Sequence, residues 1–468
     1  MKKLFFSLYT LFLCFYIVAD DHILNLTVQP YTELQFLVDG IETSGKLIST
    51  DKTLGTFEIH IPLNASTLVI KRKGYVNRVI YLHSVFSTFH FPYNKKRLYK
   101  QALSVEIGDR EINHLLKRAD IQQYLLETLT EQQPEVQSLF VALDKENSIC
   151  SFVKAIDTSQ QPKSLEFISE NMLIVPLLDD KGFQVIDSRT GSVQLISPPE
   201  QYAKQKGFVE SLYIPERNEI WVSQMSTACA HVFSADDFSY KATVTSTGQW
   251  SKVLAYNPAF DRVYLSNWIS LNISVINPHT YTEERLISLA NVPRGIAVSE
   301  DGKHLYFAEF ESPSGASSGH IVKFSIENLT REKSFGAAGA KRHCVTDFKK
   351  GLLYVSDMSR NRIEVYSLKD ESEVAIIPVY HNPNTIALAD NGKFLIVSCR
   401  GPNNPDKGYL YKGYHFGQIH IIDTETFKTV DIIEGGNQPT GLAVSPDGKT
   451  FACSDFLDAR IRIFRIKY

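Results

Sequence analysis

The sequence predicts an all-β protein in which one structural unit is repeated, and three observations lead to this prediction. Short runs of alternating or apolar residues recur along the chain, separated by turns rich in Gly, Asp and Asn. A group of such runs recurs every ~40 to 55 residues through the last two thirds of the chain. Finally, the 468 residues are 43% hydrophobic and 22% charged, which is the composition of a folded globular protein.

The net charge of the chain limits the classes of partner that it is expected to bind. There are 49 Lys and Arg residues against 52 Asp and Glu residues, a formal net charge of -3. Most nucleic-acid binders carry a marked positive excess that follows the phosphate backbone. No nucleic-acid partner is therefore expected.

The first residues predict export. Two lysines precede an apolar run from Leu4 to Val18, and Ala19 ends it before two acidic residues, which is the pattern of a signal peptide over residues 1–19. The run is shorter than the roughly 20 residues of a spanning helix, so a periplasmic, cell-surface or secreted protein with no transmembrane span is expected. Cys14 leaves lipid anchoring open, although the bulky residues before it fit a lipoprotein signal badly.

Two segments follow before the repeats begin. Residues 20–95 alternate in short β-like runs, which predicts a small β-sandwich. Within residues 96–137, apolar side chains recur at helical spacing between 110 and 130, which predicts a short helical linker. The five cysteines after Cys14 show no CxxC or CxxCH spacing, so most are expected to be small buried residues in strands, and one disulfide stays open.

The repeat is clearest in three segments, PRGIAVSEDGKHLYFAEF from Pro293, NPNTIALADNGKFLIVSCRG from Asn382 and QPTGLAVSPDGKTFACSDF from Gln438. Their Asp-Gly and Asn-Gly turns favour tight hairpins between apolar strands. Weaker copies bring the number to seven over residues 138–468, and seven units of four short antiparallel strands predict a seven-bladed β-propeller. The last copy ends one strand early, so residues 149–156 are expected to supply the missing strand and close the ring.

Two family resemblances rest on these residues. The PxGIAVSxDGKxLYFA pattern resembles the YVTN-type repeats of exported bacterial and archaeal proteins, which implies the propeller fold over 138–468 but no single function, because this scaffold hosts binders, lactonases and redox subunits. In the front segment, the order of an LxV strand, a VDG turn, a GTFEI strand and a KRKGY close resembles the PEGA-type domain of bacterial surface proteins. The Pro-Glu-Gly-Ala element itself is absent there. This second resemblance implies a role in extracellular attachment.

The sequence lacks most known catalytic motifs, and the one motif that matches is in the wrong structural context. GASSG from Gly315 matches the GxSxG pattern, but Ser317 lies in a Ser- and Gly-rich loop between strands and not on the strand-to-helix turn that the mechanism needs. A phosphate-binding loop, an HExxH zinc motif, an EF-hand loop and a dinucleotide fingerprint are also missing from the sequence. No metal site and no cofactor are expected.

The candidate ligand-binding residues follow from propeller geometry. The loops before the first strand and after the second strand of each unit lie on one face around the central channel, where a few fixed polar groups make a typical small-molecule site. An inserted loop after the second strand of the sixth unit adds exposed aromatic residues, which either grip a ligand or fold back over the channel. The wider set on this face includes Lys252 and Trp268. The selected residues are Arg294, Glu309, Arg342, His343, Asp357 and Arg400, with Tyr409, Tyr411, Tyr414 and His415 from the inserted loop.

These features predict an exported, non-enzymatic binding or adhesion protein whose loop face recognises a cell-envelope polysaccharide or other glycan, a small molecule or a surface protein. The alternative is a lactonase-like or other hydrolase that resembles the seven-bladed phosphogluconolactonase group, with Arg294, Glu309, His343 and Arg400 as substrate or acid/base residues. A third hypothesis is a redox protein with a bound quinone-type cofactor.

Overall fold

The computed structural model describes residues 21–63, 65–86 and 135–467. The expected signal peptide (1–19) and nearly all of the expected helical linker (96–137) lie outside these residues. The chain divides into two compact units, Met1–Ser148 and Ile149–Tyr468.

The first unit holds two four-stranded sheets. One sheet has the order β4 (Lys46–Asp51), β5 (Leu54–Ile61), β1 (His22–Gln29) and β8 (Val136–Ala142). The other has the order β3 (Ile41–Thr43), β2 (Gln35–Val38), β6 (Thr67–Lys71) and β7 (Arg78–Tyr81), followed by the 3-10 helix η1 (Leu82–Ser84). Alternate residues of β1 and β5 are buried, as expected of strands with one face on a core.

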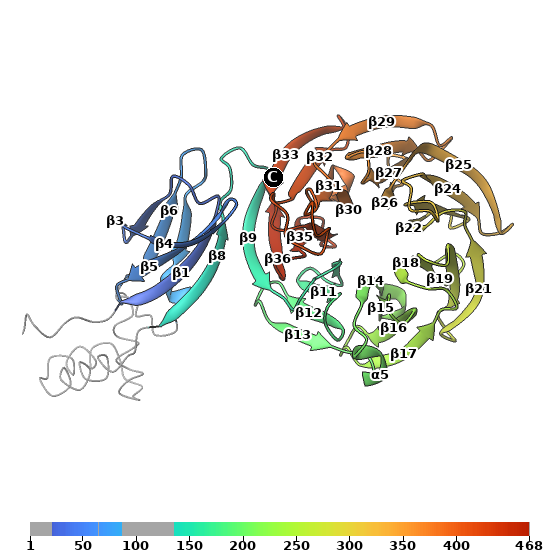
Figure 1. The fold of residues 1–468 in the computed structure, drawn as a ribbon, viewed down its shortest axis with the longest axis horizontal. Coiled ribbons are helices and arrows are strands. Elements are labelled where there is room, and N and C mark those ends of the chain that lie inside the picture. Colours follow the sequence, from blue (N-terminus) through green and yellow to red (C-terminus); the bar gives the residue numbers. More distant parts are fainter. Residues whose placement is uncertain (1–20, 64, 87–134, 468) are drawn as a thin grey trace, which may run out of the picture. The chain divides into compact units, whose positions relative to one another are not determined.

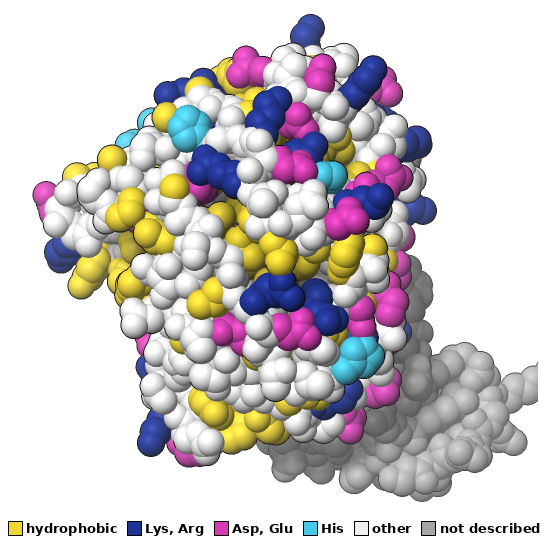
Figure 2. Space-filling model, turned by 90° about the vertical axis from the view of Figure 1, so that its right-hand side faces the viewer, with side chains coloured by type: hydrophobic (Ala, Val, Ile, Leu, Met, Phe, Trp, Pro, Cys, Tyr) yellow, Lys and Arg dark blue, Asp and Glu magenta, His cyan; other side chains and the backbone are white. Residues whose placement is uncertain are grey.

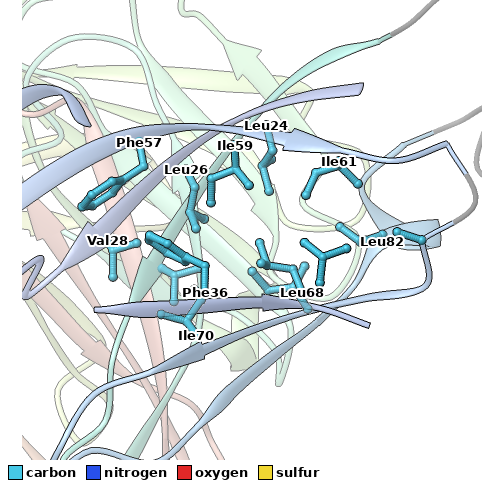
Figure 3. Close-up of a cluster of buried hydrophobic side chains, with 14 of the residues drawn as sticks. Leu24, Leu26, Val28, Phe36, Phe57, Ile59, Ile61, Leu68, Ile70 and Leu82 are labelled. Carbon is cyan, nitrogen blue, oxygen red and sulfur yellow. The ribbon is translucent and has the colours of Figure 1, made fainter. Parts of the chain in front are cut away.

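The inward side chains of both sheets form a single hydrophobic core (Figure 3). Leu24 and Leu26 of β1 face Leu68 and Ile70 of β6, and all four are completely buried. The hairpin between β2 and β3 turns at Asp39, whose carboxylate accepts the backbone N–H of Thr67 at 2.8 Å. These contacts fix the register of the second sheet.

Strand β8 belongs to this first unit because it pairs in parallel with β1, from Ile23 opposite Val136 to Gln29 opposite Ala142. The division of the structure at residue 148 is therefore later than the boundary at 138 that the repeat pattern suggested. Sequence periodicity alone does not reveal which sheet an apolar run joins.

The second unit is a β-propeller, in which four-stranded antiparallel sheets are arranged in a ring (Figure 1). In chain order, the first two sheets are β10 (Glu166–Phe167), β11 (Met172–Pro176), β12 (Phe183–Asp187) and β13 (Val193–Ile196), and then β14 (Phe208–Ile214), β15 (Glu219–Gln224), β16 (Cys229–Ser234) and β17 (Tyr240–Thr245). The third and fourth sheets are β18 (Ser251–Asn257), β19 (Arg262–Asn267), β20 (Asn272–Asn277) and β21 (Thr282–Ser288), and then β22 (Pro293–Val298), β23 (His304–Glu309), β24 (Gly319–Ser325) and β25 (Thr330–Gly339). The fifth and sixth sheets are β26 (Lys341–Asp347), β27 (Leu352–Asp357), β28 (Arg362–Ser367) and β29 (Glu373–Pro378), and then β30 (Pro383–Ala389), β31 (Phe394–Cys399), β32 (Gln418–Asp423) and β33 (Lys428–Glu434). Short helices interrupt the loops at α5 (Glu200–Ala203), η3 (Pro215–Arg217) and η4 (Asp390–Gly392).

The seventh sheet within residues 149–467 joins the two ends of the unit. It has the order β34 (Pro439–Val444), β35 (Thr450–Asp455), β36 (Arg460–Ile466) and β9 (Cys150–Asp157). Strand β9 pairs antiparallel with β36, from Asp157 opposite Arg460 to Cys150 opposite Ile466. The innermost strand β34 also contacts β10, so the ring of first strands is continuous. The pairing covers the outer edge of β36, which removes an open sheet edge.

Local sequence explains the hairpins. In the turn between β22 and β23, Gly302 has a φ of +69°, which glycine adopts without steric cost. The carboxylate of Asp301 accepts the backbone N–H of Lys303 at 3.0 Å in the same turn. The second and third strands are buried on both faces because neighbouring sheets cover them, whereas the fourth strands are largely exposed. This accounts for the apolar second strands and polar fourth strands of the repeat.

The five cysteines that the structure describes are all buried, and four of them, Cys229, Cys344, Cys399 and Cys453, are free thiols. The fifth is Cys150. Burial raises the pKa of Cys344 to about 12, so this thiol stays protonated and behaves as a small apolar side chain. The helices in the described ranges of the chain are too short or too polar to cross a lipid bilayer.

Candidate functional site

The first strands of the sheets begin on one face of the propeller with a shared irregularity. Pro293 pairs with Glu309 and Lys341 pairs with Asp357, but in each case the register shifts immediately afterwards. Arg294 and Arg342 therefore lie in β-bulges, which change the direction of a side chain relative to the sheet. We call the residues at this second position of the first strands the inner-ring residues. They are Val209, Lys252, Arg294, Arg342, Asn384 and Thr440, together with Lys163, which lies before β10 and follows the isolated bridge between Pro162 and Leu177.

A second set of residues follows the end of each second strand on the same face. We call these the collar residues, and all but one are apolar. They are Leu178, Met225, Trp268, Phe310, Met358, Arg400 and Phe456. The single polar member, Arg400, begins the inserted loop of residues 400–417.

Inner-ring and collar residues line one pocket with a volume of about 360 Å³, which we call the mouth pocket. Its inner-ring residues include Lys163, Lys252 and Arg294, and its collar residues include Trp268, Phe310 and Arg400. Tyr409 of the inserted loop and Glu311 also line it. This volume lies within the range of ordinary small-molecule sites.

Five buried cations gather in and beside the mouth pocket. Their exposed fractions are 9% for Lys163, 7% for Lys252, 6% for Arg294, 2% for Arg342 and 9% for Arg400. Their positive charges act on one another, because Arg294 and Arg342 both disfavour the charged form of Lys163 and of Lys252. Four of the five come from equivalent inner-ring positions of different sheets, so the repeat itself brings them together.

Aromatic rings partly take the place of counter-ions. The Lys252 ammonium lies 3.7 Å from the centre of the Trp268 ring, and the Arg294 guanidinium lies 4.5 Å from the same ring. Arg400 lies 4.9 Å from the Tyr409 ring. Such contacts stabilise a cation by about 0.5 to 2 kcal/mol, less than a buried ion pair with good geometry.

Burial and mutual repulsion lower the pKa values of this cluster. For Lys163 the causes are burial and then the charges of Arg400, Arg342 and Arg294, which hold its pKa well below the ordinary value. Lys252 shows the same effect from burial, Arg294 and Lys163. Burial also lowers the pKa of Arg400 to about 10. Burial and the neighbouring cations in the mouth pocket therefore both disfavour the charged forms of Lys163 and Lys252.

The structure brings together only some of the residues selected from the sequence. Arg294, Arg400 and Tyr409 line the mouth pocket, and Arg342 lies beside it in contact with Glu210 at 3.5 Å between Nη2 and Oε1. His343 follows Arg342 with its Nδ1 enclosed and without a hydrogen bond among the described residues. Burial, together with the charges of Arg342 and Arg294, lowers the pKa of His343 to about 3, so the imidazole is neutral.

Two selected carboxylates lie inside the sheets. Asp357 accepts a hydrogen bond from the Lys341 ammonium at 2.8 Å, and both side chains are completely buried. Burial opposes ionisation of Asp357, but the hydrogen bond and charge of Lys341 lower its pKa overall. The carboxylate of Glu309 accepts the Asn291 side-chain amide at 2.8 Å and is likewise completely buried. These contacts lie at the ends of the second strands, and neither Glu309 nor Asp357 lines the mouth pocket.

The inserted loop is ordered by its own contacts. The Asn404 side chain accepts the backbone N–H groups of Asp406 and Lys407, and Lys412 forms an ion pair with Asp458 at 2.9 Å. Tyr409 is placed over the mouth pocket and remains 41% exposed. The other selected residues of this loop, Tyr411, Tyr414 and His415, are exposed and do not line the pocket.

Sequence reasoning missed Lys163, Glu210 and Phe310. The signal for Lys163 and Phe310 was available, because aligning the units by their hairpin turns places Lys163 level with Arg294, and Phe310 level with Trp268. Glu210 had no such signal, since it is one residue out of step with the inner ring and reaches Arg342 from another sheet.

Sheets arranged around a central channel, with a pocket on the loop face, define the class of this protein as a β-propeller. Its fold is similar to that of a chain in the hydrazine synthase of Kuenenia stuttgartiensis, with a TM-score of 0.55, 16% identity, and coverage of 66% of this chain and 97% of that chain. At this identity the likeness shows the fold alone.

A curated relative shows the family. Antigen Lp49 of Leptospira interrogans is 47% identical to this chain over 334 residues, which is 71% of this chain and 73% of the antigen. The chain belongs to the same family as this antigen. No protein-family model matches the chain.

Proposed function

We propose that this chain is an exported, non-enzymatic binding or adhesion protein that holds a ligand of the cell envelope in the mouth pocket of its propeller. The observation that carries the proposal is the pocket itself, about 360 Å³ in volume and lined by cations, aromatic rings and apolar collar residues. A few convergent polar groups on a concave, partly apolar surface are typical of a binding site.

Export and surface exposure have two independent supports. The first 19 residues have the pattern of a signal peptide. The relative in Leptospira interrogans carries the name antigen. A periplasmic, cell-surface or secreted location for this chain accords with both, and its partner would be an envelope polysaccharide or a surface protein.

We also infer that the seven sheets of residues 149–467 are the complete ring of a seven-bladed, YVTN-type propeller, closed by β9. The front unit, with two sheets on one core, accords with a PEGA-type β-sandwich. Its role would be to attach or position the propeller at the cell surface.

Binding is favoured over hydrolysis by the identity of the residues that line the pocket. Of the four residues named for a lactonase-like mechanism, only Arg294 and Arg400 line it. Arginine keeps its proton under almost all conditions and is a poor general acid or base. Glu309 is held by Asn291 inside its sheet.

Co-sedimentation with purified peptidoglycan and envelope polysaccharide tests the proposal. The chain without its first 19 residues is compared with Tyr409→Ala and with Tyr240→Ala, a matched control because both tyrosines are 41% exposed and Tyr240 lies on the outer strand β17. The expected result is binding by the unsubstituted chain and the control, and a loss of at least about 10-fold for Tyr409→Ala. No binding to either material, or equal binding by all three proteins, would contradict the proposal.

A further inference from the structure

The buried cations of the mouth pocket differ from the other buried cations of the described chain in that most of them have no carboxylate partner. Elsewhere in the described chain, a fully buried cation has a carboxylate partner. Lys341 contacts Asp357 at 2.8 Å and Glu364 at 2.6 Å, and Arg462 contacts Asp455 at 2.7 Å. The outer rim of the propeller also mixes the two signs, with Lys and Arg interspersed among Asp and Glu (Figure 2).

The mouth pocket breaks this rule. Among the described residues, only Glu210 and Glu311 offer carboxylates that contact its cations or line it. Glu166 neighbours Glu210, but burial raises the pKa of Glu166 to about 8, so it is mostly protonated at neutral pH. With five basic side chains and two carboxylates, at least three of the basic side chains have no carboxylate of their own among the described residues. Desolvated like charges are costly unless an opposite charge joins them.

The same cations also present unused hydrogen-bond donors. Arg294 Nε, Arg342 Nη1 and Arg400 Nε are buried, and none of them has a hydrogen-bond partner among the described residues. Arg400 does donate from Nη2 to the side-chain carbonyl of Gln438 at 2.6 Å, which fixes its position. A buried donor without a partner is unfavourable, and the oxygen atoms of an acidic ligand would satisfy the donors of Arg294 and Arg400, the two of these arginines that line the pocket.

Taken together, the unpaired cations, their free donors and the apolar collar identify a ligand chemistry. We propose that the mouth pocket binds a small organic polyanion, a compact carbon frame with at least two carboxylate or phosphate groups, such as one or two acidic sugars of an envelope polysaccharide. This inference rests on the proposed function and specifies its ligand. Two or more acidic groups would supply partners to the basic side chains that lack a carboxylate, and the collar residues pack on the carbon frame.

The size of the pocket sets the upper and lower limits of the ligand. A volume of about 360 Å³ is much larger than a single inorganic anion needs, and the collar residues Trp268, Phe310 and Met358 offer it no favourable contact. A longer acidic polymer would reach the pocket with its end or with one short segment. Carboxylate and phosphate sources share this chemistry, so they are separated by experiment.

Isothermal titration at neutral pH and low salt tests the inference with two matched pairs of probes. Digalacturonate is compared with neutral galactobiose, and fructose 1,6-bisphosphate is compared with fructose. At least one anion should bind about 100-fold more tightly than its neutral partner, because the neutral sugar leaves the buried donors without partners. Raising the NaCl concentration about tenfold should weaken this binding, although less than for an exposed site. Whichever anion binds more tightly identifies the acidic group.

Substitutions place the binding in the pocket. Arg294→Gln should weaken binding of the anion at least about 10-fold, whereas Arg331→Gln on the exposed part of β25 should leave it unchanged. Thermal unfolding shows whether each variant is folded. If Arg294→Gln is unfolded, Lys252→Met replaces it in the same titration. Equal affinity for charged and neutral probes, no binding of either anion at millimolar concentration, or equal loss in the Arg331 variant would overturn the inference.

The two proposals fail in different ways. If envelope polysaccharide binds and Tyr409→Ala removes the binding, but neither salt nor Arg294→Gln changes it, the binding function stands and the polyanion is wrong. If neither envelope material nor the anions bind, both proposals fall.

Discussion

The ammonium of Lys252 lies 3.7 Å from the centre of the Trp268 ring, in a pocket where Lys252 is 7% exposed and no described carboxylate is in hydrogen-bond contact with it. Lys341 in the fifth sheet is as deeply buried but contacts Asp357 and Glu364. Lys252 is the second residue of β18 and an inner-ring residue, whereas Lys341 is the first residue of β26 and precedes the inner-ring residue Arg342. Lys341 therefore stabilises the fold through its ion pairs, and Lys252 is available to a ligand.

Lys252→Met should raise the melting temperature of the ligand-free protein or leave it unchanged. Methionine keeps the length of the side chain and its contact with Trp268, while the repulsion from Arg294 and Lys163 disappears. Differential scanning calorimetry of the two proteins at low salt measures the change. A clear decrease in melting temperature would mean that the charge of Lys252 stabilises the fold.

Lys341→Met is the matched substitution with the opposite expected result. It leaves Asp357 and Glu364 buried without their shared cation, which typically costs about 3 to 5 kcal/mol. Urea unfolding should show this loss in the free energy of unfolding. A loss below about 1 kcal/mol would show that the remaining partner, Arg362, is sufficient for Glu364.

The stability of the protein should depend on pH through Lys252. Burial and the neighbouring cations lower the pKa of Lys252 in the folded state, whereas in the unfolded chain it has its ordinary value of 10.5. Between these two values the unfolded state binds more protons, so the free energy of unfolding should rise with pH up to about 10.5. The measured quantity is the slope for the unsubstituted chain minus that for Lys252→Met, which cancels the other titrating groups. A difference of zero or of negative sign would contradict the lowered pKa.

Strand β9, the outermost strand of the last sheet, should contribute to stability through its buried side chains. The Phe152 ring is 2% exposed and packs edge-on against Phe464 at 5.8 Å between ring centres. Phe152→Ala should therefore cost about 3 kcal/mol or more. Val153→Ala on the same strand is the control, because Val153 is 37% exposed and should cost less than about 1 kcal/mol. Similar losses for the two variants would mean that β9 is only loosely attached.

Much of the fold was predictable from residues that act locally. The Asp-Gly turns at Gly302 and Gly448 set the hairpin period, and apolar second strands with polar fourth strands reflect burial between sheets. The partner of Val136–Ala142 was not predictable, because an apolar run fits the edge of either unit equally well. Long-range pairing is decided by tertiary packing and not by the local pattern.

The site was predictable only in part. Propeller geometry assigns loops to faces, which is why Arg294, Arg400 and Tyr409 could be expected near one another, and all three line the mouth pocket. Glu309 and Asp357 end the second strands next to these loops, but they do not line the pocket, and their carboxylates accept hydrogen bonds from Asn291 and Lys341. A sequence gives the position of a residue along a strand, but the partner that holds its side chain comes from another part of the chain.

The most direct measurement is the melting temperature of the unsubstituted chain and of Lys252→Met, each with and without the anion that binds in the titrations. If the cations of the mouth pocket exist to bind an acidic ligand, Lys252→Met is at least as stable as the unsubstituted chain without the anion and gains less stability when the anion is added, so the order of stability reverses. If Lys252→Met is the less stable protein under both conditions by the same amount, the buried cations belong to the fold and not to a ligand site.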